Sequence, residues 1–120
     1  MAKILIAEDE DTLRRFVSRA LVMDGHEVVE AVDGADGLDQ LREDGSYDLL
    51  LSDIRMPVMD GIELAHRAAD EFPDLKILLM TGYAEQRERA ESLSNIVVDV
   101  VSKPFSLPDI RTAVAEALVA

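Results

Sequence analysis

The chain has no cysteine and no tryptophan among its 120 residues, and aromatic residues make up only 4% of it. Without cysteine it can form neither a disulfide framework nor a thiolate metal site. Hydrophobic residues still make up 48% of the chain, so we expect a core of Leu, Val, Ile, Met and Ala. No apolar run approaches the roughly 20 residues of a membrane span, and the first run begins too early to leave room for a signal peptide. These absences favour a cytoplasmic protein that is not inserted in a membrane.

Positive charge is also scarce. The chain carries 12 Lys and Arg against 25 Asp and Glu, which gives a net charge of −13. A chain this negative is repelled by phosphate backbones and by anionic lipid surfaces. We therefore expect no nucleic-acid partner and no membrane partner.

Short apolar runs alternate with segments of helical periodicity along the whole chain. The predicted strands are residues 3–7, 27–31, 49–52, 76–80 and 96–101, and each is followed by a predicted helix. This alternation predicts an α/β fold of the (βα)5 type, in which helices cover both faces of a doubly wound parallel sheet. Both doubly wound strand orders remain open from the pattern, although five strands favour 2-1-3-4-5. No linker or repeat interrupts the pattern, so we expect one domain, residues 1–120, without an output domain.

The predicted helices differ in how clearly their boundaries are marked. The first, residues 12–23, is expected to follow an Asp11 N-cap and to end at Gly25. Its core face would carry Leu13, Phe16, Val17, Ala20 and Leu21. The fourth, residues 84–94, has few apolar residues and a Glu85–Arg89 pair, so we expect it to be exposed and easily displaced. The fifth should begin at Ser106, which has an acid three residues later.

Polar residues that could carry chemistry follow four of the five strands. Glu8 and Asp9 follow the first strand and Asp53 follows the third, while Thr81 and Lys103 end the fourth and fifth. In an open parallel sheet, ligands bind outside the carboxyl ends of the strands. Three carboxylates, a hydroxyl and an ammonium are therefore expected to converge at one edge of the sheet.

Such a group of carboxylates requires a cation, because each negative charge raises the pKa of its neighbours. Lys103 supplies one positive charge, and a hard divalent cation with oxygen ligands, Mg²⁺, would supply more. With its charge neutralised, Asp53 could act as a nucleophile on phosphorus and form an aspartyl phosphate. Lys103 and Thr81 would then hold the phosphoryl oxygens. Glu10 and Asp11 fit better as solvated acids at the start of a helix.

These residues, together with three short motifs, resemble the receiver domain of bacterial two-component response regulators. The motifs are Met56-Pro57 with Met59-Asp60-Gly61, Thr81-Gly82, and Lys103-Pro104-Phe105. The resemblance covers the whole chain and implies the strand order 2-1-3-4-5. It implies that Asp53 accepts a phosphoryl group and that Asp9, Asp53 and the backbone carbonyl of Arg55 bind Mg²⁺, with Glu8 acting through water. It also implies that Lys103 and Thr81 bind the phosphoryl group and that the Lys103–Pro104 bond is cis.

The chain departs from the family pattern at two positions near this site. The aromatic switch residue that usually lies three positions before the lysine is replaced by Val100. Tyr83 is the nearest substitute, so we expect switching to displace the loop and helix around Tyr83 on the face that includes Pro104 and Phe105. Arg55 could screen the phosphoryl group, pair with Glu8, or remain a solvated loop residue.

The partners follow from the same resemblance. His26 and His66 fit as surface residues, so the phosphodonor histidine is expected on a histidine kinase or a histidine phosphotransfer protein. Apart from self-phosphorylation and slow autodephosphorylation, we expect no enzymatic activity. The downstream protein target is not specified, and the chain could instead be a phosphoryl shuttle or sink in a relay. It is most similar to alphaproteobacterial single-domain regulators of the CpdR type, some of which act as adaptors for an ATP-dependent protease.

Three other functions fit the sequence less well. A flavodoxin-like flavin carrier needs a Ser/Thr/Gly phosphate loop where this chain has acidic residues, which repel a phosphate. A phosphatase with an aspartate nucleophile needs a second Asp where Arg55 stands. An interaction module with a degenerate site would have no reason to retain Asp9, Asp53, Thr81 and Lys103 together.

Overall fold

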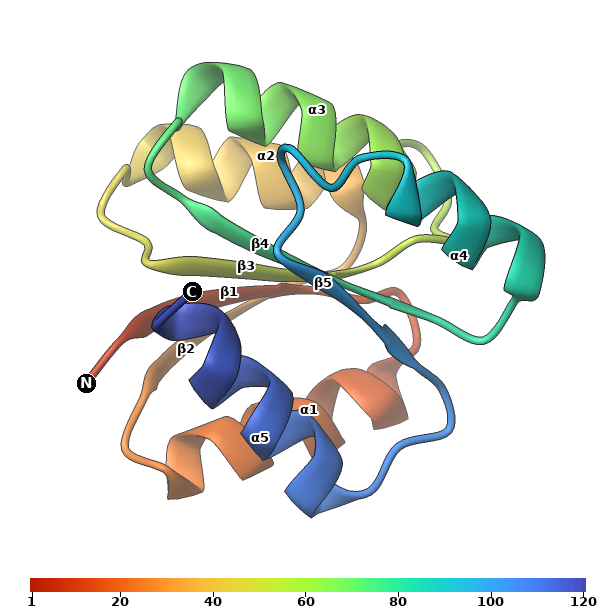
Figure 1. The fold of residues 1–120 in the computed structure, drawn as a ribbon. Coiled ribbons are helices and arrows are strands. Elements are labelled where there is room, and N and C mark those ends of the chain that lie inside the picture. Colours follow the sequence, from red (N-terminus) through yellow and green to blue (C-terminus); the bar gives the residue numbers. More distant parts are fainter.

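The computed structural model describes all residues, 1–120, and contains a single five-stranded parallel sheet in the order β2-β1-β3-β4-β5. The strands are β1 (Lys3–Ala7), β2 (Glu27–Ala31), β3 (Leu49–Asp53), β4 (Lys76–Thr81) and β5 (Asp99–Ser102). The helices are α1 (Asp11–Met23), α2 (Gly34–Glu43), α3 (Gly61–Glu71), α4 (Ala84–Glu91) and α5 (Leu107–Leu118). Helices α1 and α5 lie on one face of the sheet, and α2, α3 and α4 lie on the other (Figure 1). The predicted fold class and strand order are both confirmed.

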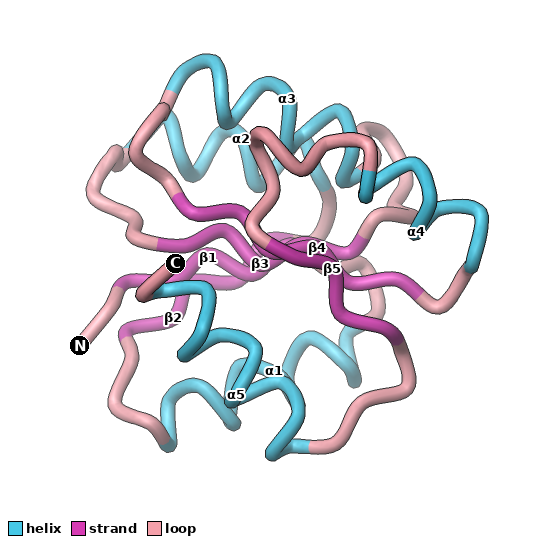
Figure 2. The backbone as a smooth tube through the Cα atoms, in the orientation of Figure 1, coloured by secondary structure: helices cyan, strands magenta, loops and turns pink.

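The alternation of side chains along each strand produces two separate cores. Leu5 points into the core beneath α2 and α3, whereas its neighbours Ile4 and Ile6 point into the core beneath α1 and α5. Each residue of β3 is buried, and only the edge strands β2 and β5 expose residues along their length. The sheet is therefore a central layer between two helical layers (Figure 2), as runs without polar alternation require. No helix is long and apolar enough to cross a membrane.

Helix α1 differs from its prediction in two respects. Its N-cap is Glu10, whose side chain makes no capping bond. Asp11 is the first helical residue, and its carboxylate accepts a hydrogen bond from Arg14 at 2.6 Å. Phe16 is 39% exposed, while Arg14 is buried on the core side of the helix. Gly25 follows the helix with φ +87°, a conformation that favours glycine, so the predicted end is confirmed.

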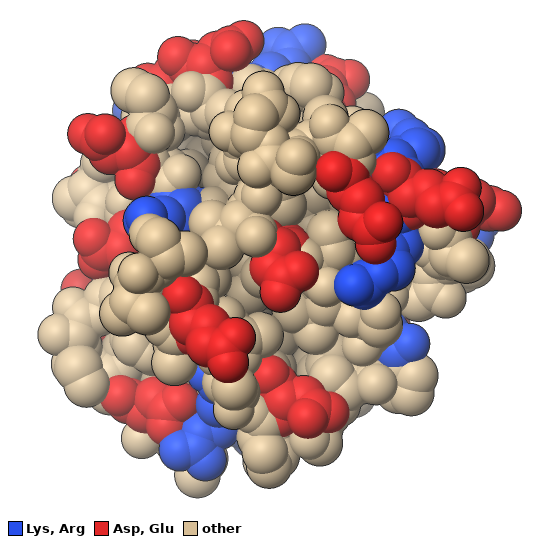
Figure 3. All heavy atoms as spheres, viewed as in Figure 1, with Lys and Arg blue, Asp and Glu red and all other residues tan.

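Helix α4 is the least apolar helix, as expected, and Ala90 is its only buried residue. It spans fewer residues than predicted, and the Glu85–Arg89 pair does not form. Instead Arg87 binds Glu91 at 3.0 Å and Arg89 lies 3.8 Å from Asp60 on the loop before α3. Acidic side chains gather over this helix on the face drawn in Figure 3.

The last strand begins later than predicted, and the last helix begins where it was predicted. β5 begins at Asp99 rather than at residue 96, because the chain still turns at residue 97, whose amide donates to Leu93. Helix α5 begins after Ser106, and Ser106 and Asp109 form the predicted reciprocal capping box.

Candidate functional site

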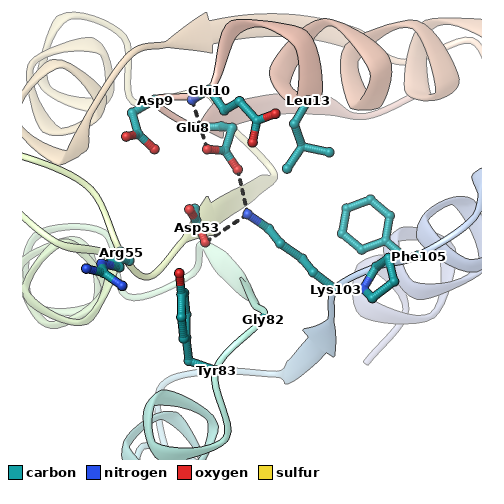
Figure 4. Close-up of a pocket in the computed structure, with 11 residues that line it drawn as sticks. Glu8, Asp9, Glu10, Leu13, Asp53, Arg55, Gly82, Tyr83, Lys103 and Phe105 are labelled. Carbon is teal, nitrogen blue, oxygen red and sulfur yellow. Dashed lines mark hydrogen bonds and ion pairs between the residues drawn. The ribbon is translucent and has the colours of Figure 1, made fainter.

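The carboxyl ends of β1 and β3 bring three carboxylates together. The two strands are paired, with Ala7 opposite Ser52, so the residues that follow them face each other. One carboxylate oxygen from each of Glu8, Asp9 and Asp53 lies within 4.8 Å of the others. Glu8 and Asp53 are buried and Asp9 is exposed at the rim (Figure 4). The predicted convergence of these carboxylates is present in the fold.

Lys103 reaches this cluster from the end of β5. Its Nζ lies 3.0 Å from Glu8 Oε1 and 3.2 Å from Asp53 Oδ1, and the close-up in Figure 4 shows it between the two carboxylates. These two carboxylates would otherwise be buried without a cation, which is costly. Lys103 therefore holds together residues that are far apart in the sequence.

The pKa values in the cluster reflect first the burial of its groups and then their charges. Burial raises the pKa of Glu8 to about 7, and the charge of Asp53 adds to this effect while Lys103 opposes it. Burial also raises the pKa of Asp53. Burial disfavours the charged form of Lys103, but its contacts with Glu8 and Asp53 raise its pKa overall. One ammonium thus does not offset the burial of Glu8 and Asp53, because the pKa of both carboxyls stays raised.

The cluster fits a hard divalent cation such as Mg²⁺. It supplies carboxylate oxygens only, and it lies on an open pocket of about 650 Å³ that leaves room for water ligands and for a phosphoryl group. The pocket is lined by Glu8, Asp9, Glu10, Leu13, Asp53, Arg55, Gly82, Tyr83, Lys103, Pro104 and Phe105. Pro104 and Phe105 therefore line the site, and the bond that precedes Pro104 is cis, as expected.

The loop after β3 is held tightly against Asp53. The amide of Ile54 donates to Asp53 Oδ1 at 3.0 Å, and the amide of Gly61 donates to the carbonyl of Ile54 at 2.8 Å. A Cβ at Gly61 would lie 2.1 Å from the carbonyl oxygen of Asp53, so only glycine permits this approach. Gly61 at the start of α3 thereby allows the loop to close against Asp53.

Arg55 does not pair with Glu8. Its guanidinium lies over the ring of Tyr83, 5.1 Å from the centroid, whereas Glu8 is already bound to Lys103. Figure 4 shows both side chains on the Asp53 side of the pocket. Of the roles expected for Arg55, the pairing with Glu8 is wrong.

Thr81 lies at the end of β4 but does not line the acidic pocket. Its hydroxyl donates to Gln86 Oε1 at 3.2 Å and accepts from the amide of Tyr83 at 3.1 Å. It lines a neighbouring hollow of about 250 Å³ that also contains Arg87, Ser102 and Lys103. In this structure the hydroxyl of Thr81 is therefore directed to α4.

Val100 is buried, and its backbone carbonyl accepts a hydrogen bond. Arg87 donates to the Val100 carbonyl at 3.2 Å and to the Ser102 hydroxyl at 2.6 Å. His66 is exposed, and half-buried His26 accepts from the amide of Ala2, so neither histidine is part of the site. The surface position expected for His66 is confirmed, whereas His26 is less exposed than expected.

Two residues that contact the site were not predicted. Gln86 carries no motif, and only its position five residues after Thr81, in the first turn of α4, could have indicated a contact. Arg14 donates to the backbone carbonyl of Glu8 at 2.8 Å and to Glu30 at 3.0 Å. An arginine spaced with Val17 and Leu21 on the apolar side of α1 was the available signal, because a buried arginine requires partners.

The chain is similar to known proteins both in sequence and in fold. The profile described as "Response regulator receiver domain" matches residues 4–115. The response regulator receiver protein CpdR of Brucella abortus is 42% identical over 120 residues, which cover 100% of this chain and 99% of CpdR. The sensor kinase CckA of the same organism is 36% identical over 98% of this chain, but the match covers 12% of CckA. The response regulator TrrA of Thermotoga maritima, solved in complex with Mg(2+)-BeF, superposes with a TM-score of 0.87 at 30% identity, covering 98% of this chain and 99% of that one.

Proposed function

Because the chain belongs to the response regulator receiver family, we propose that Asp53 is the acceptor of a phosphoryl group that switches this domain. The observation that carries the proposal is the position of Lys103, whose ammonium lies 3.2 Å from the Asp53 carboxylate on the wall of an open acidic pocket. Asp53 is buried, its pKa is raised and a cation lies beside it. These are features of a carboxylate that acts as a nucleophile on phosphorus and not of a solvated surface acid.

The transfer forms a bond between an Asp53 oxygen and phosphorus and breaks the bond between phosphorus and the imidazole nitrogen of the donor. The released imidazole keeps the bonding electron pair and takes up a proton. Lys103 is placed to bind a phosphoryl oxygen while it retains its charge. Phosphoryl transfer requires mainly this kind of positioning and charge stabilisation.

Asp9 and Asp53 would hold Mg²⁺ together with the backbone carbonyl of Arg55, and Glu8 would act through water. When bound, the ion supplies the positive charge that a phosphoryl group needs in order to approach three carboxylates. Asp9 is suited to this role, since its carboxylate is exposed at the rim and within 4.8 Å of the others. Glu8 is suited to an indirect role, because Lys103 already occupies one of its oxygens.

Receiver domains are phosphorylated by histidine kinases, and a histidine kinase or a histidine phosphotransfer protein is the partner that we propose here. The match to CpdR along 99% of its length supports a single receiver domain over residues 1–120. We propose that this domain acts in the cytoplasm by binding another protein. Phosphoryl transfer along a relay and delivery of substrates to an ATP-dependent protease are the alternatives. A pull-down from lysate with phosphorylated and unphosphorylated protein side by side distinguishes these roles.

The phosphorylation site is tested with a small-molecule acyl phosphate and Mg²⁺. Mass spectrometry should find one added phosphoryl group, labile in base as acyl phosphates are, and none in Asp53→Asn. Asp70→Asn is the matched control, because Asp70 is an exposed carboxylate on α3 that does not line the pocket. Full incorporation in Asp53→Asn would remove Asp53 from this role.

A further inference from the structure

The hydroxyl of Thr81 makes both of its hydrogen bonds outside the acidic pocket. Thr81 is 3% exposed, and its single proton is donated to Gln86 Oε1 at 3.2 Å. One lone pair accepts from the amide of Tyr83 at 3.1 Å. A hydroxyl has only one proton to donate. Its donation to Gln86 therefore excludes a simultaneous donation to a phosphoryl oxygen.

We propose that Gln86 is a positioning residue that holds the Thr81 hydroxyl toward α4 and thereby opposes capture of a phosphoryl group at Asp53. This inference rests on the proposed function of the acidic pocket. When Thr81 donates to a phosphoryl oxygen, the bond to the Gln86 carbonyl breaks, and α4 loses one of its contacts with the sheet. By the same linkage, any partner that draws Gln86 away from Thr81 favours phosphorylation.

The first turn of α4 clamps two strand ends that are themselves paired. Thr81 of β4 lies opposite Ser102 of β5 in the sheet register. Gln86 binds the first of these residues, and Arg87 binds the second at 2.6 Å. Arg87 also binds the carbonyl of Val100 at 3.2 Å. Adjacent residues of one helix thus attach to adjacent strands of the sheet.

Helix α4 depends on these polar contacts because it has little apolar contact with the sheet. It is eight residues long and buries only Ala90, and helices this short are marginal without tertiary support. Loss of the Gln86 bond leaves Arg87 as the remaining attachment of the first turn, so a small change at Thr81 can shift the helix. The side chain of Val100 has no polar atom, so it takes no part in this exchange of hydrogen bonds; only the Val100 carbonyl is bound, by Arg87.

Two substitutions at Gln86 should have opposite effects. Gln86→Met removes the acceptor at similar length, so it should strengthen binding of beryllium fluoride with Mg²⁺, a phosphoryl mimic, by a few-fold to about tenfold. It should also speed amide exchange in residues 84–91 before any mimic is added. Gln86→Glu keeps an acceptor, makes it stronger and cannot donate, so it should weaken binding of the mimic.

Two further variants control for the charge that Gln86→Glu adds and for a general effect of substitutions in α4. In a Thr81→Val background, both Gln86 substitutions should leave mimic affinity unchanged, because the bond that they alter is already absent. Glu88→Met, at an exposed position of α4, should leave affinity unchanged in the wild-type background. Circular dichroism confirms that each variant is folded.

The outcomes separate this inference from the proposed function. If the wild type binds the mimic and Gln86→Met binds it with the same affinity, Gln86 has no such role. The same holds if the Gln86 substitutions change the affinity equally in the wild-type and Thr81→Val backgrounds. Either result would leave the role of Asp53 in place. Absence of mimic binding to the wild type would overturn the proposed function and this inference with it.

Discussion

The guanidinium of Arg14 in α1 donates to the backbone carbonyl of Glu8 at 2.8 Å, at the point where β1 ends and the acidic residues begin. Arg14 is 8% exposed, and it also donates from Nη2 to Asp11 and from Nε to Glu30. This one side chain therefore joins the start of α1, the end of β1 and the end of β2. It fixes the backbone from which Glu8 and Asp9 project into the pocket.

Arg14→Met should lower both the stability and the affinity for Mg²⁺. The variant leaves the Glu8 carbonyl without its side-chain donor and Glu30 without its cation, which should cost about 2–4 kcal/mol of unfolding free energy. With the loop less constrained, Mg²⁺ affinity should fall by about tenfold. Calorimetric titration and urea unfolding measure the two effects.

The control for Arg14 is Arg111→Met, which breaks the ion pair between Arg111 of α5 and Asp24 at the end of α1. That pair also involves α1 but makes no contact with the pocket. It should therefore change stability and leave Mg²⁺ affinity unchanged. Equal Mg²⁺ affinity in wild type and Arg14→Met would show that Arg14 supports only the fold.

Asp9→Asn should largely abolish Mg²⁺ binding. It removes one charge from the three-carboxylate cluster, and ligand charge sets the affinity of such sites, so we expect a loss of at least about tenfold. Glu10→Gln is the matched control, because Glu10 lines the same pocket but is not part of the cluster. Unchanged calorimetric affinity in Asp9→Asn would exclude Asp9 as a ligand.

The principal side chains of the site could be predicted because they depend on topology. Once the apolar runs are recognised as parallel strands, Glu8, Asp9 and Asp53 must follow the strands at one edge of the sheet, whatever the details of packing. Lys103 follows from the same rule. This is also why the strand order and the layers are confirmed while several helix and strand boundaries are shifted.

The partners of long polar side chains could not be predicted, because several are within reach of each. Arg89 could pair with Glu85 on its own helix but lies near Asp60 on another segment. Thr81 could point into the pocket but donates to Gln86. Such choices depend on the tertiary positions of helices, and each alternative differs by little free energy.

Gly61→Ala should strongly destabilise the fold. A Cβ there would lie 2.1 Å from the carbonyl oxygen of Asp53, so the loop after β3 must move. We expect a loss of at least about 2 kcal/mol in unfolding free energy and weaker Mg²⁺ binding, because the same loop fixes Asp53. Gly82→Ala is the control, since its Cβ would make an ordinary contact of 3.7 Å with Lys103. Equal stability of the two variants in urea unfolding would contradict the close approach.

The metal-free protein should become less stable as the pH rises from about 5 to about 8. The pKa of Glu8 is raised from 4.5 to about 7, so within this window the native state retains a proton that the unfolded state has lost. Unfolding free energy falls with pH wherever the native state binds more protons. The raised pKa of Asp53 acts in the same direction. The raised pKa of Lys103 matters only at higher pH, and the lowered pKa of Asp44, about 2, matters only in acid.

Urea unfolding in a chelating buffer at a series of pH values measures this dependence. Wild type should lose on the order of 1–3 kcal/mol across the window, whereas Glu8→Gln should lose clearly less because its amide does not titrate. Glu10→Gln, which alters the neighbouring exposed carboxylate, should follow wild type. Mg²⁺ should reduce the loss at high pH, since ligands must be deprotonated to bind a metal and binding stabilises the native state. The same slope in wild type and Glu8→Gln would mean that Glu8 ionises in the folded protein as readily as in the unfolded chain, so that its burial does not raise its pKa.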